Sequence, residues 1–227
     1  MEVVLLGHSF IRRLRDDLVP WRPQGGRGTD VGLGHPLRAA QLARAMGVSR
    51  NVRRIYTFSD GIVRIGDVDQ AAAFVRRASP GVLLLDVGSN DLAHIVTVDP
   101  VQVLRLAVQL TDVASLFEAA IVIINAIIPR TGNITCVPDT FRENAELFNT
   151  FVKNICETSE KLVFHKLRGF WNTRHGAVTL PCQVPEWSTD GIHCDTSLSM
   201  RRYRVRTKHA ILAQVARATK QIDDATR

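Results

Sequence analysis

Four short polar segments of the sequence lie at the ends of apolar runs or just before a helical segment. They are Gly7-His8-Ser9, Ser59-Asp60-Gly61, Gly88-Ser89-Asn90-Asp91 and Asp190-Gly191-Ile192-His193. A serine at a strand-to-helix turn becomes a nucleophile when a histidine accepts its proton, and a carboxylate three residues before that histidine can orient the imidazole. We therefore predict an acyl-transfer site with Ser9 as nucleophile, His193 as general base and Asp190 as the residue that orients it.

Such a site also needs hydrogen-bond donors for the oxyanion that forms on the substrate. The candidates are the side-chain amide of Asn90 and the backbone N–H groups of Ser9 and Gly61. One well-placed donor typically lowers the reaction barrier by about 3 kcal/mol. The four segments thus supply every group that ester hydrolysis by a serine requires.

Each segment alone also has an ordinary structural explanation. Ser9 could cap a helix, Asn90-Asp91 and Asp190-Gly191 are common turn sequences, and His193 could be a surface or core histidine. The functional interpretation depends on all four segments following successive strands, because parallel strands place such residues at one edge of a sheet.

Hydrophobic periodicity predicts alternating strands and helices. The predicted strands are Val3 to Leu6, Val52 to Phe58, Val82 to Val87, Ile121 to Ile128 and Leu162 to Phe164. The predicted helices are Ser9 to Leu18, Leu37 to Met46, Val68 to Ala78, Pro100 to Phe117, Thr140 to Thr158 and Thr196 to Ile222. Because the strands are uniformly apolar, we expect one parallel sheet of about five strands with helices on both faces.

One domain spanning residues 1–227 accounts for this pattern, because 227 residues with 45% hydrophobic content can bury a substantial core. Two long irregular segments interrupt the pattern, from Pro20 to Pro36 and from Arg168 to Thr189. No apolar window is long enough to span a membrane and no leader precedes Val3, so we expect a cytoplasmic protein, or a domain cut from a longer polyprotein.

Four cysteines occur without CxxC spacing. In a cytoplasmic chain we expect Cys136, Cys156, Cys182 and Cys194 to be reduced thiols, and a disulfide between Cys182 and Cys194 stays open as the alternative. A zinc site formed by His193, Cys194 and Cys182 matches no familiar ligand spacing, so we predict no metal.

The formal net charge is +7, and arginines gather in the last predicted helix. Arg201, Arg204 and Lys208 share one stripe of that helix, and Arg202 and Arg206 share another. These cations are candidates for binding an anionic partner, either a nucleic-acid backbone or an anionic lipid surface, and a solvated helix face is the alternative.

The four segments resemble the sequence blocks of the SGNH hydrolases, also called GDSL-type esterases. "LLGHSF" with Ser9 matches the serine block, "FSDGIV" with Gly61 the glycine block, "GSND" with Asn90 the third block and "DGIH" with Asp190 and His193 the last. The resemblance implies a flavodoxin-like, three-layer α/β/α fold, and hydrolysis of a small carboxylic ester through an acyl-serine intermediate without a metal or cofactor. Esterase-like domains with a GHS block also occur in retrotransposon reading frames, which suits a basic chain.

Two positions depart from the family pattern. His8 stands where the family usually has aspartate, and since adjacent side chains on a turn generally point apart, we expect His193 to be the base. The glycine block lacks paired glycines, so Ser59 stays open as the alternative to Gly61 for the oxyanion. Trp187 either borders the acyl pocket or packs on the core.

The acyl group is expected to be short, because no long apolar segment suggests a lid or lipid tunnel. The rival function is an SGNH-fold module without catalysis that binds nucleic acid or another anionic partner, since a fold does not fix a function.

Overall fold

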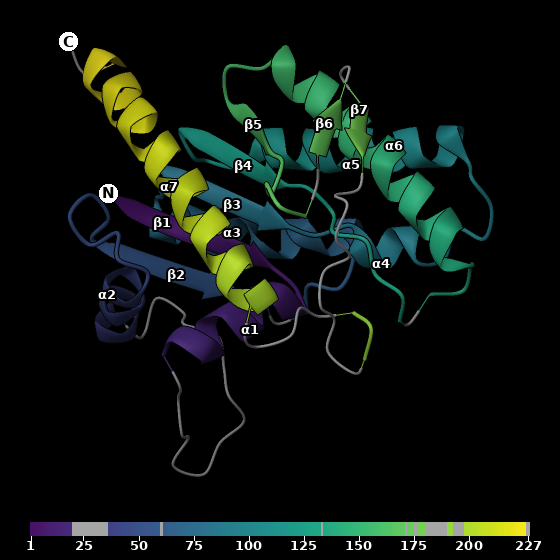
Figure 1. Ribbon diagram of the computed structural model, residues 1–227. Helices are drawn as coiled ribbons and strands as arrows, with labels where there is room; N and C mark the ends of the chain where they lie inside the picture. Colours follow the sequence, from purple (N-terminus) through teal and green to yellow (C-terminus); the bar gives the residue numbers. More distant parts are fainter. Residues whose placement is uncertain are drawn as a thin grey trace.

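The computed structural model describes residues 1–19, 36–59, 61–132, 134–170, 172–174, 177–179, 190–192 and 198–225. A five-stranded parallel sheet forms its centre (Figure 1). The strands are β1 (Glu2–Gly7), β2 (Arg54–Phe58), β3 (Val82–Asp86), β4 (Ile121–Asn125) and β5 (Leu162–His165), in the order β2-β1-β3-β4-β5. This arrangement confirms the predicted parallel sheet and the three-layer fold.

The strands are uniformly apolar because helices cover both faces of the sheet. Val3, Val4, Leu5 and Leu6 of β1 are each fully buried, although neighbouring residues of a strand point to opposite faces. Leu5 pairs with Thr57 on one side and with Leu84 on the other, so β1 lies inside the sheet.

Helices α1 (Ser9–Leu18) and α7 (Leu198–Ala225) lie on the same face of the sheet (Figure 1). The Phe10 ring of α1 and the Tyr203 ring of α7 lie 5.3 Å apart. Helix α2 (Pro36–Ala45) packs beside β2. Helices α3 (Ala72–Ala78), α5 (Pro100–Leu116) and α6 (Pro138–Glu157) belong to the connections that cross the opposite face. The predicted start of α5 is confirmed, since Asp99 accepts a hydrogen bond from the Gln102 N–H at 2.9 Å.

Local structure departs from the sequence prediction at several points. The segment predicted as a helix from Val68 begins as a 3-10 helix, η1 (Ile65–Ala71), before α3. A short helix, α4 (Ser89–Leu92), follows β3, and α6 begins earlier than predicted, with Pro138 in its first turn behind Val137. The hairpin of β6 (Asn172–Arg174) and β7 (Ala177–Thr179) lies within a segment predicted to be irregular.

Within the described ranges, Cys136 and Cys156 are free thiols, whereas Cys182 and Cys194 lie outside them. None of the helices in these ranges is long and apolar enough to cross a membrane.

Candidate active site

The strand order places the predicted serine turn between two other predicted turns. Strand β1 leads into Ser9, and its neighbours β2 and β3 lead into the turns that hold Gly61 and Asn90. In an open parallel sheet, ligands bind beyond the carboxyl ends of the strands, where the chain connections leave in opposite directions. In this sheet that place is between β1 and β3, so Ser9 and Asn90 lie on its two sides.

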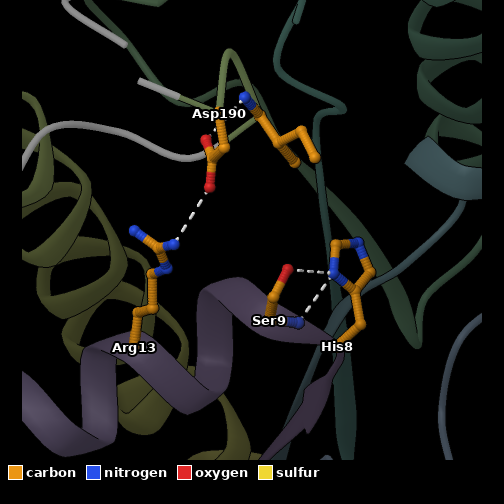
Figure 2. A network of polar contacts seen from close by, with 5 residues as sticks. His8, Ser9, Arg13 and Asp190 are labelled. Carbon is orange, nitrogen blue, oxygen red and sulfur yellow. Dashed lines mark hydrogen bonds and ion pairs between the residues drawn. The ribbon is translucent and has the colours of Figure 1, made fainter. Parts of the chain in front are cut away.

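Ser9 is the first residue of α1 and is half-buried. The Nδ1 atom of His8, which is the N-cap residue, lies 2.7 Å from the Ser9 hydroxyl oxygen and accepts a hydrogen bond from the Ser9 N–H, also at 2.7 Å (Figure 2). The two side chains therefore face each other, and the expectation that they point apart is wrong. Ser9 is not the helix cap, because His8 has that role.

The two contacts of the His8 Nδ1 atom show that this nitrogen accepts hydrogen bonds and donates none. An Nδ1 atom that accepts the Ser9 N–H carries no proton, so the Ser9 hydroxyl donates to the same nitrogen. The Ser9 N–H, which we predicted as an oxyanion donor, is thus engaged by His8. It becomes available to a substrate only when the His8 ring moves away.

Asp190 is joined to α1 through Arg13, which lies one helical turn after the serine. The Asp190 Oδ2 atom accepts a hydrogen bond from Arg13 at 3.1 Å, and its Oδ1 atom accepts one from the Ile192 N–H at 2.9 Å (Figure 2). Arg13 is four residues after Ser9, so both side chains lie on the same face of α1. Asp190 is therefore joined to the helix that begins with Ser9, while His193 lies outside the described residues.

Asn90 lies in α4, directly after β3, and its amide orientation is fixed from both ends. The Nδ2 group donates to the Val63 carbonyl at 2.9 Å, and the Oδ1 atom accepts a hydrogen bond from Arg130 at 2.9 Å. An amide nitrogen carries two hydrogens, so the bond to Val63 leaves the second hydrogen for a substrate oxygen.

The turn after β2 is joined to the same helix. Asp91 accepts a hydrogen bond from the Ile65 N–H at 3.1 Å, and burial raises the pKa of this carboxyl. Gly61 has a φ of +76°, which favours glycine, and it is exposed, whereas Ser59 is buried. Gly61 and Ser59 both stay candidates for the second oxyanion donor.

Arg130 is a residue of this site that the sequence analysis missed. Its side chain is 3% exposed, lies over the Phe141 ring at 5.5 Å and binds Asn90, and burial lowers its pKa to about 10. A lone arginine after a strand carries no recognisable pattern. Only the fold shows that the end of β4 lies beside the end of β3.

The residues after Arg130 hold the Asp190 turn. The N–H groups of Thr131 and Gly132 both donate to the Gly191 carbonyl at 2.9 Å. A Cβ atom at Gly132 would lie 1.8 Å from the Asp190 carbonyl oxygen, so only glycine fits there. One loop thus connects the amide of Asn90 to the turn that carries Asp190.

The predicted cationic cluster of α7 is divided between two sides of the helix. Arg204 pairs with Asp17 of α1 at 3.6 Å, and the Lys208 amine lies near Gly47 after α2. Arg202 and Arg206 lie on the other side, where they donate to the carbonyls of Gly169 and Arg168, while Arg201 is exposed. Trp187 lies outside the described residues, and no group of His, Cys, Asp or Glu within them could hold a metal ion.

Comparison with known proteins shows which family and which solved structures the chain resembles. The family model "GDSL-like Lipase/Acylhydrolase" matches residues 3–194. No curated protein sequence matches the chain.

Three solved structures are similar in fold. A putative acylhydrolase from Bacteroides fragilis is 16% identical with a TM-score of 0.59, covering 94% of this chain and 88% of its own. A GDSL-like lipase from Bacteroides thetaiotaomicron is 14% identical with a TM-score of 0.54, covering 93% and 88%. A serine-to-alanine mutant of an acetyl esterase, solved with an acetate ion, is 13% identical with a TM-score of 0.53, covering 95% and 98%.

Proposed function

Because the chain belongs to the GDSL-like lipase/acylhydrolase family, we propose that it is a serine esterase that hydrolyses short-chain carboxylic esters through an acyl-serine intermediate. The observation that carries the proposal is the Ser9 hydroxyl, which lies at the start of α1 with an imidazole nitrogen 2.7 Å away. This contact orients the hydroxyl in the resting state, and the serine becomes a nucleophile when the neutral imidazole of His193 accepts its proton.

In the proposed reaction, the Ser9 oxygen attacks the ester carbonyl carbon while its proton passes to the imidazole of His193. The carbonyl electron pair moves onto the carbonyl oxygen, which becomes an oxyanion. When the intermediate collapses, the C–O bond to the alcohol breaks and the imidazolium gives its proton to the leaving oxygen. A water molecule then repeats the sequence on the acyl-serine, which releases the acid.

The base is assigned to His193 rather than to His8 for a physical reason. A proton on the Nδ1 atom of His8 would face the Ser9 N–H at 2.7 Å, which places two donors against each other. His8 therefore orients the serine hydroxyl in the resting state. The contact between Asp190 and Arg13 of α1 supports the assignment of Asp190 as the residue that orients the imidazole three residues later in the chain.

The oxyanion is assigned to the free N–H of Asn90, with Gly61 as the second donor. Ser9 supplies a third N–H once His8 releases it. A donor that is already oriented stabilises the developing charge without reorganising, and Arg130 and Val63 provide that orientation for Asn90.

The short acyl chain is a separate part of the proposal. Its support is the sequence, in which no long apolar segment predicts a lid, and an acetyl esterase of the same fold. The test is hydrolysis of p-nitrophenyl acetate, butyrate and octanoate by the wild type, Ser9→Ala and the control Ser115→Ala, whose hydroxyl bonds within α5.

We expect the rate to fall as the acyl chain lengthens, Ser9→Ala to lose about a thousandfold or more, and Ser115→Ala to match the wild type. Failure to hydrolyse any of the three esters would favour the rival function, an SGNH-fold module without catalysis.

A further inference from the structure

A cavity of about 780 Å³ lies along β5, the edge strand of the sheet, between α6 and α7. Five of its lining residues are cationic, namely Lys153, Lys166, Arg168, Arg206 and Arg217. Glu157 is the one carboxylate among the lining residues described, and it already pairs with Lys153 at 3.0 Å. Ser9, Asn90 and Asp190 do not line this cavity.

A second, shallower hollow of about 420 Å³ lies on α7 beside this cavity. It shares Arg206 and His209 with the first cavity and adds Arg201 and Arg202. Arg201 and Arg217 are sixteen residues apart on one helix, so the positions of α7 that line the two hollows span about 24 Å along its axis. We call these two hollows the basic groove.

Several cations of the basic groove are held in place by the backbone. Arg202 donates to the Gly169 carbonyl at 3.2 Å, Arg206 donates to the Arg168 carbonyl at 2.8 Å, and Arg217 donates to the Glu160 carbonyl. Each guanidinium bonds a neutral carbonyl there, so its positive charge is not cancelled. A row of fixed cations loses little conformational entropy when an anion binds.

Titratable groups in the groove respond to this positive field. Burial lowers the pKa of His165 to about 4, and the charges of Arg206 and His209 act in the same direction. Burial and then the charge of Arg168 lower the pKa of the Lys166 amine. A negatively charged occupant would relieve the repulsion among these groups.

We propose that the basic groove binds the sugar-phosphate backbone of a single-stranded nucleic acid. A length of about 24 Å exceeds one phosphate group and fits a chain of several. The groove is concave, so it fits an extended chain rather than a flat membrane surface. Half-buried Phe164 is among the lining residues, and an aromatic side chain beside a row of cations is the combination found in non-specific single-strand sites.

The binding test uses fluorescence anisotropy of a labelled oligothymidylate of about 12 nucleotides, within the usual site size of such grooves. The groove variant is Arg168→Gln with Arg201→Gln, because both side chains are exposed and neither makes a hydrogen bond or ion pair with another described residue. The control variant, Arg77→Gln with Arg105→Gln, removes the same charge from exposed positions on α3 and α5.

We expect the groove variant to bind about tenfold or more weakly at 0.1 M salt, and its slope of log K against log salt to fall in magnitude by about one to two. The control variant should bind like the wild type, and both should hydrolyse esters normally, because none of the four arginines belongs to the proposed catalytic site. The binding result therefore does not depend on whether the protein hydrolyses esters.

Three results would overturn the proposal. One is equal weakening by the groove and control variants, which would make binding a property of net charge alone. Another is the absence of oligothymidylate binding by the wild type. The third is binding of the wild type to phosphatidylserine vesicles in a sedimentation assay, if the groove variant binds them more weakly and oligothymidylate does not compete with them. That result would assign the groove to a membrane surface.

Discussion

His8 and Ser9 show how one substitution in a short motif changes the local chemistry. His8 caps α1 and accepts from both the hydroxyl and the N–H of Ser9. The sequence predicted the serine turn and its place before a helix. It could not predict this contact, because the directions of adjacent side chains depend on the backbone angles of the turn.

The roles of the two histidines can be separated by replacing each one. Asparagine at position 8 keeps an N-cap acceptor and removes the titratable ring. We expect His8→Asn to retain more than about a tenth of the wild-type kcat/KM and the rise in activity through about pH 6 to 7 that a histidine base produces. His193→Ala should abolish activity, and loss of the pH dependence in His8→Asn alone would make His8 the base.

Arg130 donates a hydrogen bond to Asn90, so we expect the effects of replacing the two residues to depend on each other. We expect Asn90→Ala to reduce kcat about a hundredfold with little change in KM, and Arg130→Gln to reduce kcat about tenfold. In the double variant, Arg130→Gln should reduce kcat almost no further than Asn90→Ala does alone. Full additivity, with folding confirmed by circular dichroism, would show that Arg130 acts elsewhere.

At the scale of elements, strands and helices follow the sequence pattern closely and the loops that hold the site do not. Apolar runs and capping residues placed β1, α1 and α5 within a residue or two of their bounds. The short hairpin of β6 and β7 has no such pattern. The bonds from Thr131 and Gly132 to Gly191 join segments about 60 residues apart, so only the folded chain shows them.

The contact between the two loops leads to a prediction for Gly132. Alanine there would place a Cβ atom against the Asp190 carbonyl, so the Asp190 turn must shift and its contact with Arg13 is disturbed. We expect Gly132→Ala to lower kcat about tenfold or more. Gly66→Ala is the control, because its Cβ would meet nothing closer than 3.9 Å, and it should keep wild-type kinetics. Normal kinetics of Gly132→Ala would show that the turn is not needed in this position.

At the scale of the whole molecule, α7 is joined to the sheet by a buried polar network. Tyr203 donates to Asp86, Asn125 donates to the same carboxylate at 3.1 Å, and His165 bonds Asn125 at 2.9 Å. Burial raises the pKa of Asp86 and lowers that of His165 to about 4. The apolar strands gave no sign of this network, since its members come from three strand ends and a distant helix.

The lowered pKa of His165 predicts a loss of stability in mild acid. Below about pH 6.5 the unfolded chain binds a proton that folded His165 refuses, so the free energy of unfolding falls as the pH drops towards 4. Between pH 7 and 5 this amounts to about 2 kcal/mol. The variant His165→Asn keeps a donor to Asn125. In denaturant unfolding, its free energy of unfolding should fall between pH 7 and 5 by about 2 kcal/mol less than that of the wild type. An equal fall in both proteins would contradict the prediction.

The proposed esterase activity depends on Ser9 being the nucleophile. A fluorophosphonate probe, which forms a covalent bond with an activated serine, tests this most directly when tryptic mass spectrometry locates the adduct. We expect one adduct on Ser9 in the wild type, none in Ser9→Ala, and full labelling in the control Ser115→Ala. Labelling that persists in Ser9→Ala would place the nucleophile elsewhere, and an unlabelled wild type would contradict catalysis by this serine.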